Sequence, residues 1–134
     1  MNLVVAKYDE DKNTYIYDIN PGFPPNCKVC NYDSFTQIDL KSQLMLFIGA
    51  IYDGNSMGIA NSLAEVSLIY PEVTFCFKFI FDEIELEKVA PKEVGHPMLP
   101  IILCVNNGLL SVVSNGLIHK NVLNAKIAAL FREA

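Results

Sequence analysis

The chain has 134 residues, 51% of them hydrophobic and 19% charged, with a formal net charge of −5. This length fits one domain of ordinary size, and the hydrophobic fraction excludes a disordered chain. Ten Lys and Arg residues oppose fifteen Asp and Glu residues and are scattered along the sequence. Because binding of nucleic-acid phosphates requires a clustered basic face, we expect no nucleic-acid partner.

The apolar stretches do not predict a membrane protein. The first six residues are apolar, but Lys7 and the charged run 9–12 follow at once, so we expect no secretory signal there. Residues 44–52 are too few to span a bilayer. Residues 95–119 carry no charged Asp, Glu, Lys or Arg, yet Pro97, Pro100 and two Asn-Gly pairs interrupt them. We therefore expect a cytoplasmic protein with no membrane partner.

The four cysteines are Cys27, Cys30, Cys76 and Cys104, and they do not predict a disulfide framework in a chain of this size. Cys76 and Cys104 lie in apolar runs and are predicted to be buried. Cys27 and Cys30 have the C-x-x-C spacing, but in an extended segment their side chains point to opposite faces. Zinc binding is not predicted, since His96 and His119 show no ligand spacing. No metal and no cofactor is expected.

The N-terminal part is predicted to be a hairpin followed by a stiff connector. Residues 3–8 and 14–19 are rich in β-forming side chains and flank a turn-forming run, 9–13. Residues 21–25 contain three prolines and a glycine, which continue neither a helix nor a strand ladder. We therefore divide the chain into a hairpin with its connector, residues 1–25, and a main domain, residues 26–134.

The first half of the main domain alternates between strand and helix patterns. Residues 27–31 are predicted to be extended, and Asp33 or Ser34 is a candidate N-cap for a short helix. The apolar run 44–48 is typical of a strand that is covered on both faces. A loop over 52–56, in which Ser56 is a candidate cap, then leads into a helix that ends at Tyr70.

The second half continues this alternation. Residues 73–81 alternate with period two, which places Val73 and four phenylalanines, the last being Phe81, on one face of a strand. A weaker helix over 83–94 is interrupted by Pro91. Strands over 99–105 and 109–113 flank a turn at 106–108, and a helix over 119–131 ends the chain. Strands alternating with helices predict an α/β fold.

Residues 26–131, in this order, resemble the thioredoxin fold. Residues 33–35 resemble the start of the family's first helix, and 44–50 with 52–57 resemble its strand and active-site loop. Residues 99–108 resemble the cis-proline strand and its turn, and Gly116 with Lys120 resembles the start of the last segment. The resemblance implies an α/β, thioredoxin-like mixed sheet with helices on both faces, preceded here by an N-terminal β-hairpin extension.

The resemblance also implies where the family's reactive groups would lie. The family has Trp-Cys-Gly-Pro-Cys-Lys in its active-site loop, and the two cysteine positions fall on Asp53 and Ser56. Neither side chain can attack or resolve a disulfide, and the family's buried acid falls on Phe47. Asp53 has no identifiable catalytic partner. We therefore predict that the chain is redox-inactive and not an enzyme.

The family's groove for extended polypeptide supplies the functional prediction. A cis Pro100 would leave the neighbouring backbone free to pair with a partner strand. We predict a non-catalytic module that binds a protein or peptide as an adaptor, assembly or chaperone-like factor. Two alternatives stay open, a thiol–disulfide oxidoreductase using Cys27 and Cys30, and a structural subunit that forms a homo-oligomer through its hairpin. The predicted groove consists of Tyr52, Asp53, Gly54, Asn55, Ser56, Leu99, Pro100 and Gly116.

Overall fold

The computed structural model describes residues 4–20 and 22–131 and contains seven strands within them. The strands are β1 (Val4–Asp9), β2 (Thr14–Ile19), β3 (Cys27–Val29), β4 (Leu44–Ala50), β5 (Thr74–Ile80), β6 (Ile101–Asn106) and β7 (Leu109–Asn115). The α-helices are α1 (Gly54–Val66), α2 (Glu83–Val89) and α3 (Lys120–Phe131). Short 3₁₀ helices are η1 (Phe35–Gln37), η2 (Ser67–Ile69) and η3 (Lys92–Val94).

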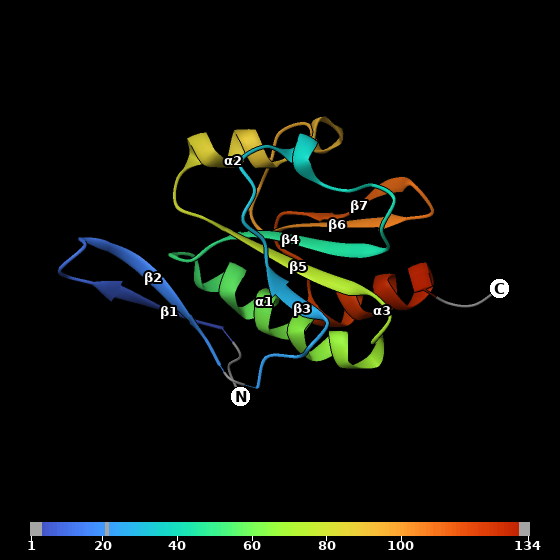
Figure 1. Cartoon of the computed structure of the whole chain (residues 1–134), viewed down its shortest axis with the longest axis horizontal. Helices are drawn as coiled ribbons and strands as arrows, with labels where there is room; N and C mark the ends of the chain where they lie inside the picture. The colour runs from blue at the N-terminus through green and yellow to red at the C-terminus, as the bar shows by residue number, and fades with distance from the viewer. Residues whose placement is uncertain (1–3, 21, 132–134) are drawn as a thin grey trace.

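Five strands form one mixed sheet in the order β3-β5-β4-β6-β7. Strands β3 and β4 run parallel to β5, whereas β6 is antiparallel to both β4 and β7. Helices α1 and α3 cover one face of this sheet, and α2 covers the other (Figure 1). The predicted α/β fold with helices on both faces is therefore confirmed.

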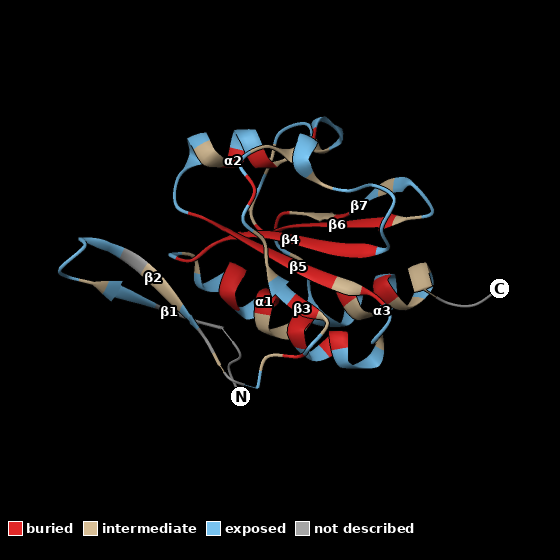
Figure 2. Ribbon diagram, in the orientation of Figure 1, coloured by how far each residue is buried: buried red, intermediate tan, exposed pale blue. Residues whose placement is uncertain are grey.

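The central strands are buried on both faces. All seven residues of β4 are buried, as expected for an apolar run between two layers of helix (Figure 2). Along β5, Phe75, Phe77 and Phe79 pack with α1 and α3, whereas Cys76 and Ile80 pack with α2. Two hydrophobic cores result, one on each side of the sheet.

The hairpin β1–β2 forms a sheet of its own and does not extend the five-stranded sheet (Figure 1). The ring of Tyr17 lies 4.8 Å from that of Phe79, and Phe23 lies 5.6 Å from Phe77, measured between centroids. These rings join the hairpin and its connector to the core on the α1 side. The domain boundary at residue 25 stays a prediction, and residue 3 and Pro21 lie outside the described residues.

Two predicted elements differ from the structure for local reasons. The helix expected after Asp33 is only the 3₁₀ turn η1, which Ser34 caps in a reciprocal capping box with Gln37. It stops because Asp39 accepts hydrogen bonds from the Lys41 amide and the Ser42 hydroxyl, which hold a separate turn.

Strand β5 is shorter than predicted, and this changes the role of its last phenylalanine. Phe81 was expected on the same strand face as the other phenylalanines, but β5 ends at Ile80 and Phe81 is 47% exposed. The carboxylate of Asp82 caps α2 by accepting a hydrogen bond from the Glu85 amide, so the chain turns immediately after the strand.

Candidate functional site

The register of the sheet brings three loops to one edge. Ile48 of β4 lies opposite Ile101 of β6, so the residues that follow β4 lie beside those that precede β6. Ile101 in turn pairs with Asn115, which places Gly116 at the same edge. The Gly116 amide donates a 2.9 Å hydrogen bond to the carbonyl oxygen of Pro100. The predicted groove residues therefore belong to one edge, although their role in binding stays a prediction.

Asp53 is the N-cap of α1, in keeping with a capping role for this side chain, whereas the other candidate cap, Ser56, does not cap the helix. The Asp53 carboxylate accepts hydrogen bonds from the amides of Asn55 and Ser56 and a 2.8 Å bond from the Ser56 hydroxyl. Ser56 is 0% exposed and packs against Gly49, where an added Cβ would lie 3.0 Å from the Ser56 Cβ. Ser56 therefore supports the loop from below and offers no surface to a partner.

The other predicted groove residues differ in exposure. Tyr52, Gly54 and Asn55 are exposed, and Asp53 and Leu99 are half-buried. Pro100 and Gly116 are buried, so they shape the edge without contributing much area. The Leu99–Pro100 peptide bond is cis.

Met98 is held over this edge by the segment that follows β7. Its amide donates a 2.7 Å hydrogen bond to the side-chain oxygen of Asn115, and the Asn115 amide group donates to the His96 carbonyl. Gly116 has a φ of 101°, and a Cβ there would lie 3.0 Å from the Met98 Cε. The glycine therefore leaves room for the methionine side chain, which stays 52% exposed.

Exposed apolar side chains gather around the same loops. Ala50 pairs with Ile80 at the ends of β4 and β5, so Phe81 and the first turn of α2 also lie at this edge. Large exposed apolar clusters on a protein surface commonly mark binding sites. Of these side chains, sequence analysis placed only Tyr52 in the predicted groove, partly because Phe81 continues the alternation of β5 and Ile84 sits in a charged run. We define the edge patch as Tyr52, Phe81, Ile84, Met98 and Leu117, which are 47% to 71% exposed.

Carboxylates surround part of this edge patch. Partial burial raises the pKa of Tyr52, and the charges of Glu83, Asp53 and Asp82 raise it further. These three acidic side chains therefore lie close enough to the Tyr52 ring to act on its hydroxyl group. The rim of the patch on this side is negatively charged.

The cysteines lie on both sides of the sheet. The Cys27 thiol donates a 3.1 Å hydrogen bond to the Ser67 hydroxyl within the core on the α1 side. Cys30 packs instead against the core on the α2 side, which contains Cys76. The structure thus separates Cys27 from Cys30 and brings Cys30 to Cys76. Cys76 and Cys104 are buried, as predicted.

The thiols also differ in acidity. The pKa of Cys30 is lowered to about 7, chiefly because the Cys76 thiol hydrogen-bonds to it. Partial burial opposes this shift, and the charge of Lys28, the Phe77 backbone and the charge of Lys78 lower the pKa further. The same interaction and burial raise the pKa of Cys76. Burial raises the pKa of Cys104 to about 11. Cys30 is therefore the most nucleophilic of these three thiols at neutral pH.

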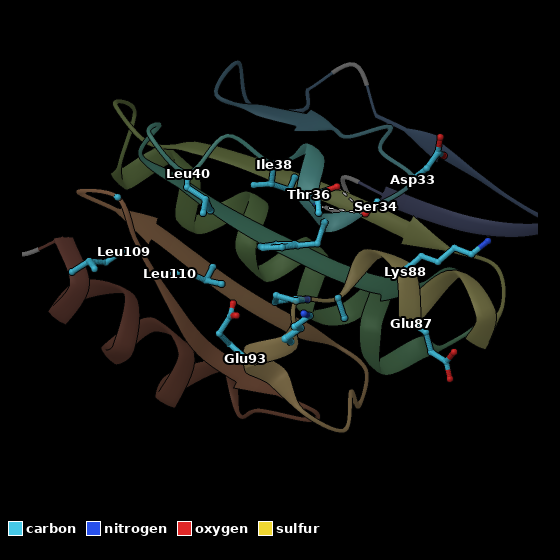
Figure 3. Close-up of a pocket in the computed structure, with 15 residues that line it drawn as sticks. Asp33, Ser34, Thr36, Ile38, Leu40, Glu87, Lys88, Glu93, Leu109 and Leu110 are labelled. Carbon is cyan, nitrogen blue, oxygen red and sulfur yellow. Dashed lines mark hydrogen bonds between the residues drawn. The ribbon is translucent and has the colours of Figure 1, made fainter.

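Several cavities lie on the α2 side. One, of about 710 Å³, lies between η1, the α2–η3 segment and the β6–β7 turn, with Ile38, Leu40 and Leu110 around it (Figure 3). Another, of about 420 Å³, is lined by both Cys30 and Cys76. In residues 4–20 and 22–131, no three His, Cys, Asp or Glu side chains converge as metal ligands. Across the same residues, no helix is long and apolar enough to cross a membrane.

The fold is that of solved thioredoxins. Mitochondrial thioredoxin 3 from Saccharomyces cerevisiae, in its oxidised form, is 17% identical, with a TM-score of 0.53 over 67% of this chain and 82% of that chain. A thioredoxin from Trypanosoma brucei brucei is 14% identical, with a TM-score of 0.60 over 87% of this chain and 99% of that chain. No protein-family model and no curated protein matches the sequence. These likenesses establish the thioredoxin-like fold.

The prediction that the chain is not an enzyme is corrected. It rested on Asp53 and Ser56 at the family's cysteine positions and on Phe47 at its buried acid, but the solved neighbours are thioredoxins, and the chain keeps the Cys27–Cys30 spacing together with an acidified Cys30 thiol. Asp53 and Ser56 do not by themselves exclude thiol chemistry, because the chain has cysteines outside this loop.

Proposed function

We propose that the edge patch binds an extended segment of a partner protein, as an adaptor or assembly factor would. The observation that carries this proposal is that five exposed apolar residues lie beside the strand ends at one edge of the sheet, after β4, β5 and β7 and before β6. An extended segment suits such an edge, because it can place alternate side chains onto the patch. The proposal concerns binding, and it applies equally to a carrier and to an enzyme that captures its substrate this way.

The frame beneath the edge patch is fixed by hydrogen bonds, which favours binding. Asp53 holds the first turn of α1, Gly116 is bonded to Pro100, and Asn115 holds Met98. A surface that is already ordered loses less conformational entropy when a partner binds. Little rearrangement of these loops is therefore needed for docking.

The charges at the rim define the chemistry of the partner. Asp53, Asp82 and Glu83 lie around Tyr52, and the whole chain has a net charge of −5. A segment that carries Lys or Arg between apolar residues would complement both the patch and its rim. We therefore propose a basic, apolar peptide segment as the occupant.

The two alternatives rest on other parts of the chain. An oxidoreductase that joins Cys27 to Cys30 would have to bring together thiols that pack in cores on opposite sides of the sheet. A homo-oligomer formed through β1–β2 would use a hairpin that contacts its own core through Tyr17. Self-association through this hairpin stays a prediction.

A selection from random twelve-residue peptides tests the proposed function. Peptides that bind the protein are sequenced, and the dissociation constant of the best one is measured for the wild type, Tyr52→Ala and Met98→Ala. The control variants are Leu68→Ala and Ile69→Ala, which remove apolar side chains of similar exposure from η2. Because η2 precedes β5, these two side chains lie at the opposite edge of the sheet from the edge patch.

The expected peptides combine Lys or Arg with apolar residues. Each variant of the edge patch should weaken binding about tenfold, as central apolar contacts do, whereas the control variants should bind like the wild type. Equal affinity of all five proteins would contradict the proposal. Selection of acidic peptides would also contradict it. So would peptides whose binding is weakened only by the two η2 variants.

A further inference from the structure

Two thiols from neighbouring parallel strands meet on the α2 side of the sheet, away from the edge patch. Lys28 of β3 pairs with Cys76 of β5, and the Cys30 amide, just beyond β3, donates a 2.8 Å hydrogen bond to the Phe77 carbonyl. Residues 28, 30 and 76 therefore share one face of the sheet. The Cys30 thiol is hydrogen-bonded by that of Cys76.

Both thiols line the same cavity, which has a volume of about 420 Å³. Cys30 is half-buried there, whereas Cys76 lies deeper and is 4% exposed. This volume lies in the range of small-molecule sites. The arrangement leaves Cys30 as the thiol within reach of a ligand and Cys76 as its buried neighbour.

Charged groups at this cavity come from several elements. Lys28 lines it from β3, and Asp39 lines it from the turn after η1. Lys78 of β5 lies 5.6 Å from the centroid of the Tyr32 ring and 3.8 Å from the Glu85 carboxylate of α2. Tyr32 is buried, and its hydroxyl group donates to the Val89 carbonyl. The charges of Lys28 and Lys78 thus both act on the Cys30 thiol, and Asp39 lines the same cavity as Cys30.

We propose that Cys30 is a nucleophilic thiol that forms a mixed disulfide with a small peptide-like disulfide bound in this cavity. Lys28 would contact a carboxylate of that ligand, and Asp39 would contact its ammonium group. Cys76 is a positioning residue, because it stabilises the Cys30 thiolate by donating a hydrogen bond.

The reaction is a single thiol–disulfide exchange. The Cys30 thiolate attacks one sulfur of the ligand, and a bond between Cys30 Sγ and that sulfur forms as the ligand's own S–S bond breaks. The second half of the ligand leaves as a thiolate and takes a proton from water. The Cys30 sulfur is oxidised, the leaving sulfur is reduced, and no other oxidant is needed.

Oxidised glutathione is the probe, because it is a small peptide disulfide that carries both carboxylates and ammonium groups. The folded protein is incubated with it, and the product is analysed by intact mass and by mapping the modified peptide. One glutathionyl group per chain is expected, attached to Cys30. Mapping on the wild-type protein identifies the thiol without relying on the folding of a variant.

Variants distinguish modification of Cys30 in this cavity from modification of the other cysteines. Cys30→Ser should abolish the modification, whereas Cys27→Ser and Cys104→Ser should leave it unchanged. Lys28→Gln should slow the reactions with both disulfides through the raised pKa of Cys30, but it should slow the reaction with oxidised glutathione severalfold more than that with the uncharged hydroxyethyl disulfide. In Cys76→Ala, which removes the hydrogen-bond donor, the midpoint of the rate against pH should move above its wild-type position near pH 7.

Three results would overturn the inference. The first is modification spread over several cysteines at similar rates, which would indicate unselective oxidation. The second is an internal disulfide as the end product. The third is an equal slowing of the reactions with the charged and the uncharged disulfide in Lys28→Gln, which would mean that Lys28 does not contact the ligand. The peptide affinity of the edge patch should be the same before and after modification, so the two proposals fail independently.

Discussion

The amide of Gly116 donates a 2.9 Å hydrogen bond to the carbonyl oxygen of Pro100, across the edge where β6 begins and β7 ends. This bond holds the loop before β6 against the segment that leads into α3. Met98 lies above it and belongs to the edge patch. The shape of the proposed binding surface therefore depends on Gly116, which is itself buried.

Replacing Gly116 should disturb this edge. Its φ of 101° is unfavourable for other residues, and a new Cβ would meet the Met98 side chain at 3.0 Å. Gly116→Ala should lower the free energy of unfolding by about 1–3 kcal/mol in a urea titration. Gly58→Ala is the matched control, because Gly58 lies in α1 with open space around its Cβ, and it should raise stability by about 0.5–1 kcal/mol. Equal effects at the two sites would contradict this account of Gly116.

The cap of α1 should contribute measurably to stability. Asp53 accepts hydrogen bonds from the Asn55 and Ser56 amides, so Asp53→Ala leaves these donors without their partner. We expect a loss of about 0.5–2 kcal/mol on chemical denaturation, and a much smaller loss for Asp53→Asn, which can still cap the helix. An equal loss for asparagine and alanine would show that Asp53 acts through its charge instead.

Asn26 joins the start of β3 to the end of the α1 region. Its side-chain amide shares its hydrogens among the carbonyl oxygens of Ser67, Tyr70 and Val73. Asn26→Ala should destabilise the protein by about 2–4 kcal/mol, because partly buried carbonyls lose their donors. Asn26→Asp keeps the size but points a carboxylate at the same carbonyls, so it should be at least as harmful. The midpoint of thermal unfolding measures the effect of both Asn26 variants. Asn31→Ala, at an exposed asparagine, is the control.

Buried thiols should make the protein less stable in alkali. Burial raises the pKa of Cys104 to about 11, above that of a thiol in the unfolded chain. Between about pH 9 and 11 the unfolded chain loses this proton while the folded one keeps it, so the free energy of unfolding falls as pH rises. The Cys104 contribution is about 2–3 kcal/mol over that window. In Cys104→Ala the fall should be shallower, and an unchanged slope would contradict the assignment.

The elements of the fold could be predicted where local patterns suffice. The apolar run of β4, the alternation in β5, the Asn107–Gly108 turn and Pro91 after α2 each depend on neighbouring residues only. Ser56 misled the prediction of the α1 cap, because Asp53 and Ser56 are both good caps and only the three-dimensional hydrogen bonds distinguish them.

The two proposed sites depend on relationships that local patterns do not contain. Cys30 and Cys76 meet because β3 pairs with β5 in a particular register across a long stretch of chain. Phe81 and Met98 join one patch because β5 ends at Ile80 and β6 begins just after Pro100. Such contacts follow from strand order and register, which the composition of each segment does not specify.

The central claim, that the edge patch binds an extended segment, is tested most directly by methionine-methyl NMR during titration with the best selected peptide. Met98 is 52% exposed within the patch, and Met45 is 1% exposed inside β4 and serves as the internal control. We predict that the Met98 methyl signal shifts in proportion to the bound fraction while that of Met45 stays in place. A peptide that binds without moving the Met98 signal would contradict the proposed function.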